Sequence, residues 1–288
     1  MTFPDAGPIA GLSEIAARYD VILSDVWGVL HNGVSAYASA GAALAQYRRD
    51  GGRVVLITNA PRPSAPIIDM IDHLGVPRAS WDAMVSSGDC TRVMIAPYAG
   101  KVIHHVGPAT TDNGLYEGLN VTRGPAEAAS AVVVTDLDED EEVPEAYLPR
   151  MRLWLDRGLP LICANPDKVV EVGDRLYYCA GALADLYAEM GGEVLMAGKP
   201  YTPIYEDALR LAEAAAGRPV PRDRILAIGD SVRTDATGAA AFDIDLLFIT
   251  GSVHAEELDA FGSPDPAAVR ALVAPSHARL AGFMPRLA

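Results

Sequence analysis

The chain has 288 residues, half of them hydrophobic, and a formal net charge of −15. This length suits two domains with large cores, because domains usually hold roughly 100–200 residues. The negative charge argues against binding to nucleic acids or to anionic membranes, whose phosphates the surface would repel. A negatively charged small-molecule substrate would need local neutralisation, most simply by a metal ion and a lysine.

The three cysteines are odd in number and form no CxxC pair, so neither a disulfide framework nor a zinc site is expected. Residues 1–7 lack a basic region followed by an apolar stretch, and no apolar span approaches the roughly 20 residues that a membrane helix needs. The sequence therefore predicts a cytoplasmic protein that spans no membrane.

Short apolar runs alternate with segments of helical periodicity, which is typical of a mainly parallel α/β sheet. Ser13 and Ser64 are candidate helix N-caps. In chain order, the pattern predicts a strand over residues 21–25, a helix over 38–50, a strand over 54–59, a helix over 63–74, and strands over 225–230 and 245–250. Three of these strands end in polar residues, namely Asp25, Thr58 with Asn59, and Asp230. Parallel strands share one carboxyl edge, so we expect these side chains to converge there.

The middle of the chain has its own strand-like runs over residues 101–107, 131–137 and 159–164, with a helical segment over 145–156. This pattern predicts a second α/β domain inserted over residues 89–193 into a core formed by 1–88 and 194–288. The acidic run 136–142 is interpreted as a solvated loop before a helix rather than as a metal site. The predicted fold is a doubly wound, Rossmann-like parallel sheet with an α/β insertion.

Four short motifs occur in a recognisable order along the chain. Residues 21–30, with Asp25 after a buried-type strand, resemble the first motif of the haloacid dehalogenase superfamily of aspartate-nucleophile phosphatases. Thr58-Asn59, Gly198-Lys199-Pro200 and the segment from Gly229 to Asp235 resemble the second, third and fourth motifs. Singly, each match could be a turn, a surface lysine or a capped helix, but their shared order favours the family.

The resemblance implies a role for each matched residue. Asp25 would be the nucleophile, and Lys199 would neutralise the phosphoaspartyl charge. Thr58, Asn59 and Lys199 would hold the phosphoryl oxygens. A Mg²⁺ ion would be bound by Asp25, Asp230 and the backbone carbonyl of Trp27, with Asp235 supporting these ligands from behind; hard oxygen donors suit this ion.

The insertion occupies the position of the family's C2 cap, between the second and third motifs. Residues 164–167 and 179–182 resemble the class IIA, NagD-like branch. The resemblance implies that the cap contacts the leaving group through Asn165, Asp167 and Gly181, although Asn165-Pro-Asp167 could equally be a plain turn. A homodimer formed through the caps would be compatible with this branch.

Trp27 departs from the family pattern, which usually has a second Asp as general acid and base two residues after the nucleophile. An indole cannot exchange protons in this way. We therefore expect a Mg²⁺-dependent phosphohydrolase of a small phosphorylated metabolite, a sugar phosphate or a nucleotide-like compound, which forms an aspartyl phosphate.

Its leaving group would need little protonation, or the acid would come from the substrate or from His31, which could also be an ordinary surface-loop histidine. The alternative is a catalytically impaired protein that binds phosphometabolites. A receiver-type signalling domain is a remote third possibility, because the chain is long and carries a large insertion.

Overall fold

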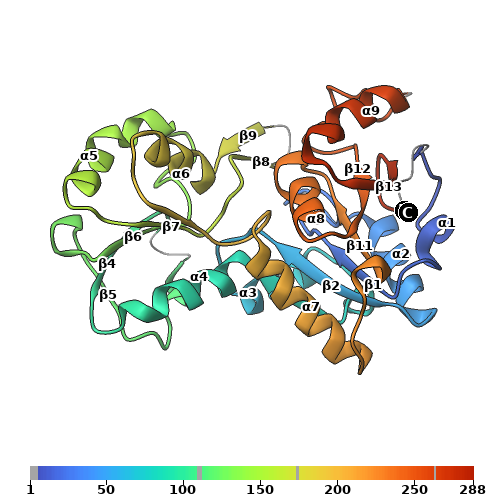
Figure 1. Ribbon diagram of the computed structural model, residues 1–288, viewed down its shortest axis with the longest axis horizontal. Coiled ribbons are helices and arrows are strands. Elements are labelled where there is room, and N and C mark those ends of the chain that lie inside the picture. The colour runs from blue at the N-terminus through green and yellow to red at the C-terminus, as the bar shows by residue number, and fades with distance from the viewer. Residues whose placement is uncertain (1–5, 109–111, 173–174, 263) are drawn as a thin grey trace.

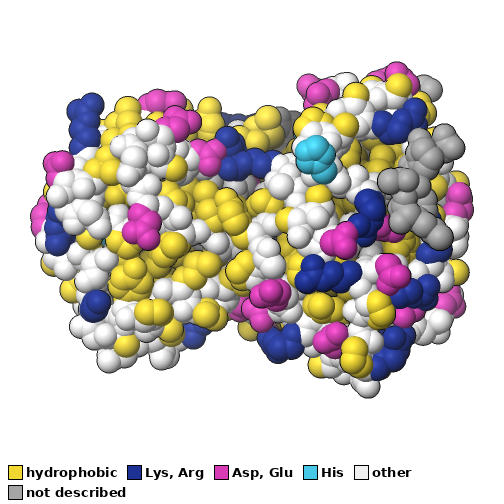
Figure 2. All heavy atoms as spheres, in the orientation of Figure 1, with side chains coloured by type: hydrophobic (Ala, Val, Ile, Leu, Met, Phe, Trp, Pro, Cys, Tyr) yellow, Lys and Arg dark blue, Asp and Glu magenta, His cyan; other side chains and the backbone are white. Residues whose placement is uncertain are grey.

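The computed structural model describes residues 6–108, 112–172, 175–262 and 264–288, so residues 1–5 of the N-terminal segment lie outside it. The chain forms two lobes, each built on a parallel sheet with flanking helices (Figure 1). A narrower waist joins the lobes (Figure 2). Among the described residues, no helix has the length and apolar character needed to cross a membrane.

The larger sheet has six parallel strands in the order β13-β12-β11-β1-β2-β3. From β1 the chain moves outward to β2 and β3, and from β11 it moves outward in the other direction. The strand order therefore reverses between β1 and β11, which is where doubly wound sheets bind ligands. The strands are β1 (Val21–Ser24), β2 (Arg53–Thr58), β3 (Ala83–Ser86), β11 (Ile225–Gly229), β12 (Asp245–Ile249) and β13 (Arg279–Met284).

Helices cover both faces of this sheet (Figure 1). Along β1, Val21 and Leu23 pack with the residues of α7, whereas Ile22 packs with those of α2 and α3, as the two-residue period of a strand requires. The predicted doubly wound α/β core is confirmed. One face carries α1 (Ser13–Ala16), α2 (Ala38–Arg49) and α3 (Ser64–His73), and the other carries α7 (Thr202–Ala216), α8 (Thr237–Ala241) and α9 (Pro266–Val273).

The second sheet has five parallel strands in the order β10-β7-β6-β4-β5. Helices α5 (Leu148–Asp156) and α6 (Ala180–Glu189) pack on one face, and α4 (Ser87–Ile95) contributes Ile95 to the other. An antiparallel pair, β8 (Val169–Val172) and β9 (Arg175–Tyr178), stands apart from the sheet. The sheet strands are β4 (Val102–Val106), β5 (Thr122–Arg123), β6 (Ala131–Val134), β7 (Leu161–Cys163) and β10 (Val194–Met196).

The structure differs from the predicted elements in two respects. Strand β10 pairs with β7 of the second sheet, although the predicted boundary at residue 194 assigned it to the core; a three-residue apolar run does not reveal which sheet it joins. Ser13 and Ser64 are first helical residues rather than N-caps, because Leu12 and Pro63 occupy the capping positions. The division of the chain into domains stays a prediction.

Candidate active site

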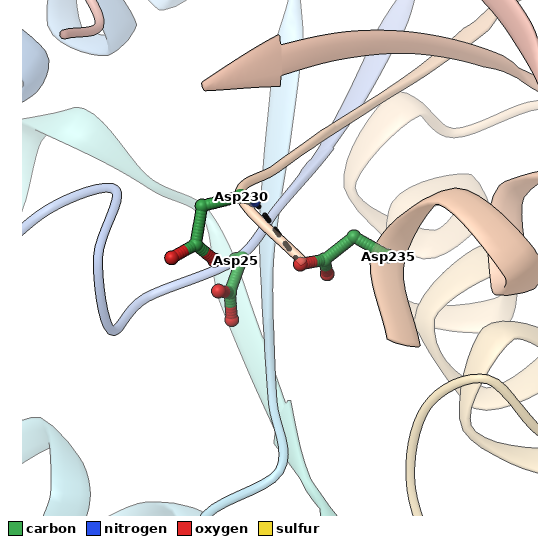
Figure 3. Close-up of side chains that lie close together, drawn as sticks. All are labelled: Asp25, Asp230 and Asp235. Atoms are coloured by element: carbon green, nitrogen blue, oxygen red, sulfur yellow. Dashed lines mark hydrogen bonds between the residues drawn. The ribbon is translucent and has the colours of Figure 1, made fainter. Parts of the chain in front are cut away.

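Three carboxylates lie together at the carboxyl edge of the larger sheet, beside the reversal between β1 and β11. Asp25 directly follows β1 and Asp230 directly follows β11, while Asp235 belongs to the short π-helical turn Val232–Ala236. One oxygen from each carboxylate lies within 4.8 Å of the others, as Figure 3 illustrates. Among the described residues, this is the one cluster of acidic, histidine or cysteine side chains suited to hold a metal ion.

Lys199 connects two of these carboxylates. Its Nζ donates hydrogen bonds to Asp25 Oδ1 at 2.6 Å and to Asp235 Oδ1 at 2.7 Å. Burial lowers the pKa of Lys199, but the negative charges of Asp235 and Asp25 outweigh this effect and keep the pKa well above its ordinary value. The lysine is therefore a fixed positive charge beside the predicted nucleophile.

Asp235 supports the loop after β11. Its Oδ2 accepts hydrogen bonds from the backbone N–H groups of Asp230 at 3.2 Å and Ser231 at 3.1 Å. An added Cβ at Gly229 would lie 2.1 Å from Asp235 Cγ, so the close approach requires glycine there. Both oxygens of Asp235 are thus engaged by protein groups, which suits a residue that supports a metal site from behind.

The charge of the cluster is unbalanced. Burial is the largest cause that raises the pKa of Asp25 well above its ordinary value; Lys199 opposes it, and Asp235 and Asp230 add to it. Burial and then Asp235 raise the pKa of Asp230 to about 7. Three carboxylates face one ammonium, which leaves two negative charges uncompensated when all are ionised. A divalent cation with hard oxygen ligands fits this donor set.

Backbone geometry also brings the turn after Asp25 against the carboxylates. Gly28 has a φ of 83°, and an added Cβ would lie 2.3 Å from Asp230 Oδ2. The peptide that follows Trp27 therefore runs directly beside the Asp230 carboxylate. The indole of Trp27 lines the cavity and packs over Gly33, whose added Cβ would lie 2.6 Å from Trp27 Cη2. The role of the Trp27 carbonyl stays a prediction.

His31 is fully buried, so its interpretation as a surface-loop histidine is wrong. Its Nδ1 accepts a hydrogen bond from the Gly33 N–H at 2.9 Å, and burial lowers the pKa of the ring to about 4. These observations assign a neutral ring that carries its proton on Nε2. Because a neutral imidazole is a weak acid, His31 is poorly suited to protonate a leaving group.

The second predicted motif lies beside Lys199. Thr58 Oγ1 accepts a hydrogen bond from the Ala60 N–H at 3.2 Å. Asn59 Oδ1 accepts from the Lys199 N–H at 2.7 Å, and Asn59 Nδ2 donates to Lys199 O at 3.1 Å. The same Nδ2 donates to Asp167 Oδ1 at 3.0 Å, across the waist. The Asn59 side chain therefore connects the second motif, to which it belongs, with the third motif and with the smaller lobe through hydrogen bonds.

The predicted cap residues divide into two groups. Asn165 and Asp167 line a cavity between the lobes, together with Thr58, Asn59 and Lys199. Gly181 is not among the described residues that line it. Its N–H donates to Asp167 O at 3.0 Å, and an added Cβ would lie 2.3 Å from Pro166 O. Gly181 thus supports the loop that carries Asp167 from behind.

The cavity has a volume of about 750 Å³ and extends from the carboxylate cluster to the smaller lobe. Asp136, from the acidic run 136–142, lines it, and burial raises its pKa to about 7. The solvated-loop interpretation therefore fails for Asp136, while Asp140 is exposed. Arg62 Nε, from the larger lobe, lies 3.6 Å from Asp112 Oδ1 of the smaller lobe.

Several residues of this region were not predicted from the sequence. Arg233, inside the fourth motif, donates to Pro166 O at 2.7 Å and to Asp185 Oδ1 at 2.9 Å, and so joins the core to the loop that carries Asp167. Its place within the motif was a usable signal. Ser252, which hydrogen-bonds Asp230, follows β12 in a segment without a recognisable pattern.

Two family descriptions match the sequence. The haloacid dehalogenase-like hydrolase family matches residues 22–117, and a HAD-hydrolase-like family matches residues 196–275. No curated protein matches the sequence.

Two solved structures share the fold at low sequence identity. A possible sugar phosphatase from Cytophaga hutchinsonii has 19% identity and a TM-score of 0.76 over 96% of this chain and 97% of its own. A glycerol phosphate phosphatase from Mycobacterium tuberculosis, in complex with magnesium, has 22% identity and a TM-score of 0.63 over 87% and 74%.

A hydrolase from Brucella suis, described as haloacid dehalogenase-like, is much more similar. It has 43% identity and a TM-score of 0.86, over 96% of this chain and 99% of its own. This similarity covers nearly the whole of both chains. The chain therefore belongs to the haloacid dehalogenase-like family of hydrolases, as its motifs predicted.

Proposed function

We propose that this chain is a Mg²⁺-dependent phosphatase of the class IIA, NagD-like type, which hydrolyses a small phosphorylated metabolite through an aspartyl phosphate on Asp25. The observation that carries the proposal is the contact of Lys199 Nζ with both Asp25 and Asp235, beside Asp230 and at the reversal of the sheet. A carboxylate nucleophile, a fixed cation and a set of oxygen donors are thereby brought to one point.

The reaction assigns a task to each residue. The Asp25 carboxylate attacks phosphorus, while Thr58, Asn59 and Lys199 hold the phosphoryl oxygens. Asp25, Asp230 and the Trp27 carbonyl would hold Mg²⁺, with Asp235 behind them. When bound, the ion neutralises charge on the phosphoryl oxygens and on the nucleophile. Lys199 stays protonated and balances the negative charge of the phosphoaspartate.

Residues 89–193 would act as a cap over this site. The cavity is bounded by both lobes, so a substrate would be enclosed between them and water would be excluded. Carboxylates from the smaller lobe, Asp112 and Asp136, border the cavity, and such groups accept hydrogen bonds from hydroxyls. This end of the cavity suits a hydroxyl-rich leaving group, which supports a sugar phosphate as substrate.

The test is the release of inorganic phosphate from a panel of sugar phosphates, nucleotides and acyl phosphates, with and without Mg²⁺. The Asp25→Asn variant should lose turnover by at least about 10³-fold, because the nucleophile is removed. Asp20→Asn is a matched control, since Asp20 precedes the same strand and pairs with Arg218 and Arg224 at the surface. Unchanged release by Asp25→Asn would contradict the proposal. Tight ligand binding by the unsubstituted protein without turnover would instead favour a binding protein.

A further inference from the structure

The unusual feature of this active site is that no acid follows the nucleophile at the usual position. Trp27 has an indole N–H that does not exchange protons usefully. Several other titratable side chains line the cavity. Asp25, Asp230 and Asp235 belong to the nucleophile and metal site, Lys199 is paired with two of them, and His31 is a buried neutral ring.

Asp167 occupies a different position. It lies in the loop between β7 and β8, so it enters the cavity from the smaller lobe. Its Oδ1 accepts a hydrogen bond from Asn59 Nδ2 at 3.0 Å. Asn59 is one of the three residues proposed to hold the phosphoryl group, so the Asp167 carboxyl is one hydrogen bond away from that set of residues.

We infer that Asp167, supplied by the cap, is the general acid and base of this enzyme in the role that Trp27 cannot fill; this inference rests on the proposed phosphatase function. In an in-line displacement the leaving oxygen departs on the side opposite the nucleophile. Asp25 would attack from the core, and the cavity that it shares with Asp167 continues from there to the cap, so the opposite side of the phosphoryl group would face the cap. A carboxyl on the cap is therefore on the side where the leaving oxygen is released.

The loop that carries Asp167 is held from three sides. The Asp167 N–H donates to Asn165 Oδ1 at 3.1 Å, and Gly181 N–H donates to Asp167 O at 3.0 Å. Arg233 Nη1 donates to Pro166 O at 2.7 Å. Because these bonds fix the backbone on both sides of the residue, its carboxyl is pre-positioned, as acid catalysis requires.

The surroundings of Asp167 raise the pKa of its carboxyl above the ordinary value. Burial is the largest effect and raises its pKa, and the negative charge of Asp235 acts in the same direction. Lys199, the hydrogen bond from Asn59 and the positive charge of Arg233 oppose it, and the net pKa stays above its ordinary value. Since Oδ1 accepts from Asn59, Oδ2 is the oxygen that would carry the proton of the acid form.

Asp167 alone accounts for the proton transfers in both steps. In the first step Asp25 forms a bond to phosphorus, the bond between phosphorus and the leaving oxygen breaks, and the proton on Asp167 moves to that oxygen to give the free alcohol. In the second step the Asp167 carboxylate takes a proton from water, whose oxygen attacks the phosphoaspartate. Inorganic phosphate leaves, Asp25 is again a carboxylate, and Asp167 is again protonated.

The test compares leaving groups that need protonation with one that does not. The Asp167→Asn variant keeps an oxygen that can accept from Asn59, so the cap contact can persist. First-turnover rates are measured with p-nitrophenyl phosphate, phenyl phosphate and an alkyl phosphate. We expect roughly 10²–10⁴-fold loss with the alkyl ester and little change with p-nitrophenyl phosphate. With the latter, a burst of one nitrophenol per enzyme should appear, because the second step also loses its base.

Control variants separate this role from rival explanations. Asp185→Asn neutralises another cap carboxylate, which is bonded to Arg233, and should change all substrates in equal proportion. Asp136→Asn and His254→Asn remove the protons of two other cavity-lining groups. A loss confined to poor leaving groups in either of these variants, and absent from Asp167→Asn, would overturn the assignment.

The outcomes also separate this inference from the function on which it rests. No turnover of any ester by the unsubstituted protein would overturn the proposed function and the inference with it. Turnover by the unsubstituted protein, with an equal loss for all leaving groups in Asp167→Asn, would overturn the inference alone and assign Asp167 a purely structural role. A steeper dependence on the leaving group in Asp167→Asn would support both.

Discussion

The indole of Trp27 lies edge-on to the imidazole of His31, with ring centroids 5.0 Å apart. The two residues also pair through their backbones, and the Gly28 N–H donates to His31 O at 2.8 Å. Trp27 is therefore part of a closed turn directly after Asp25, the proposed nucleophile. The indole of Trp27 stabilises this turn by packing, and this structural role accounts for a large side chain at the position.

Replacing Trp27 with Asp should separate packing from metal binding. The shorter, charged side chain would leave His31 and Gly33 uncovered, so we expect the free energy of unfolding to fall by about 1–3 kcal/mol. Mg²⁺ binding, measured by calorimetry, should persist, because the proposed ligand at this position is the backbone carbonyl. Loss of Mg²⁺ binding by a variant that still folds would contradict that assignment.

His31 should influence stability and leave the pH dependence of catalysis unchanged. Its pKa falls from 6.5 to about 4 on folding because the ring is buried, so the folded chain binds fewer protons between these values. This contribution to stability is therefore present above pH 6.5 and is lost as the pH falls toward 4.

The His31→Asn variant offers an oxygen to the Gly33 N–H and cannot titrate. Its denaturant-unfolding curves should depend less on pH between about 4 and 6.5 than those of the unsubstituted chain. Its pH profile of kcat should keep the same shape. A profile that lost its basic limb in this variant would identify His31 as the acid after all.

Much of the site could be predicted because its residues follow strong local signals. Asp25, Thr58 and Asp230 each come at the end of an apolar run that is buried in the sheet. The shared carboxyl edge of parallel strands then brings them together, whatever the helices between them do. Asp235 follows Asp230 by one turn, so its support of the same loop is also a local property.

The contacts between the lobes could not be predicted in the same way. The bond from Asn59 to Asp167 joins residues 108 positions apart, and it depends on how the cap is oriented rather than on any local pattern. Strand β10 has only three residues, too few for a periodicity to reveal its sheet. His31 lies in a polar stretch that suggests a surface loop, and its burial beside the indole of Trp27 depends on packing that this local pattern does not show.

In the metal-free protein, the contribution of the carboxylate cluster to stability should fall as the pH rises toward neutrality, opposite in sign to the contribution of His31. The pKa of Asp230 is raised to about 7 by burial and by Asp235, so the folded chain holds more protons than the unfolded chain between about pH 4 and 7. The associated stability is present at low pH and is lost as the pH rises through this window.

Added Mg²⁺ should reverse this loss, because it replaces the protons as the balancing charge. At a concentration 100 times its Kd, the ion should stabilise the fold by about 2.7 kcal/mol. Thermal unfolding at pH 5 and pH 7.5, with Mg²⁺ or with a chelator, measures both effects. An equal Mg²⁺ effect at the two pH values would show that these carboxylates are not the binding site. Asp25→Asn offers a further check, since it should weaken the response.

The Gly28→Ala substitution should disable the active site through a single added methyl group. Its Cβ would lie 2.3 Å from Asp230 Oδ2 and 2.6 Å from Ser252 Oγ, so Asp230 must move from its place beside Asp25.

Gly51→Ala is a matched control, because Gly51 also has a positive φ, of 101°, but no atom lies within 4 Å of its added Cβ. Both variants should lose about 1 kcal/mol of stability from backbone strain. Only Gly28→Ala should lose Mg²⁺ binding by calorimetry and phosphate release in the same proportion, because only there does the methyl group displace a proposed metal ligand. Equal activity in the two variants would show that the approach of the backbone to Asp230 is not required for catalysis.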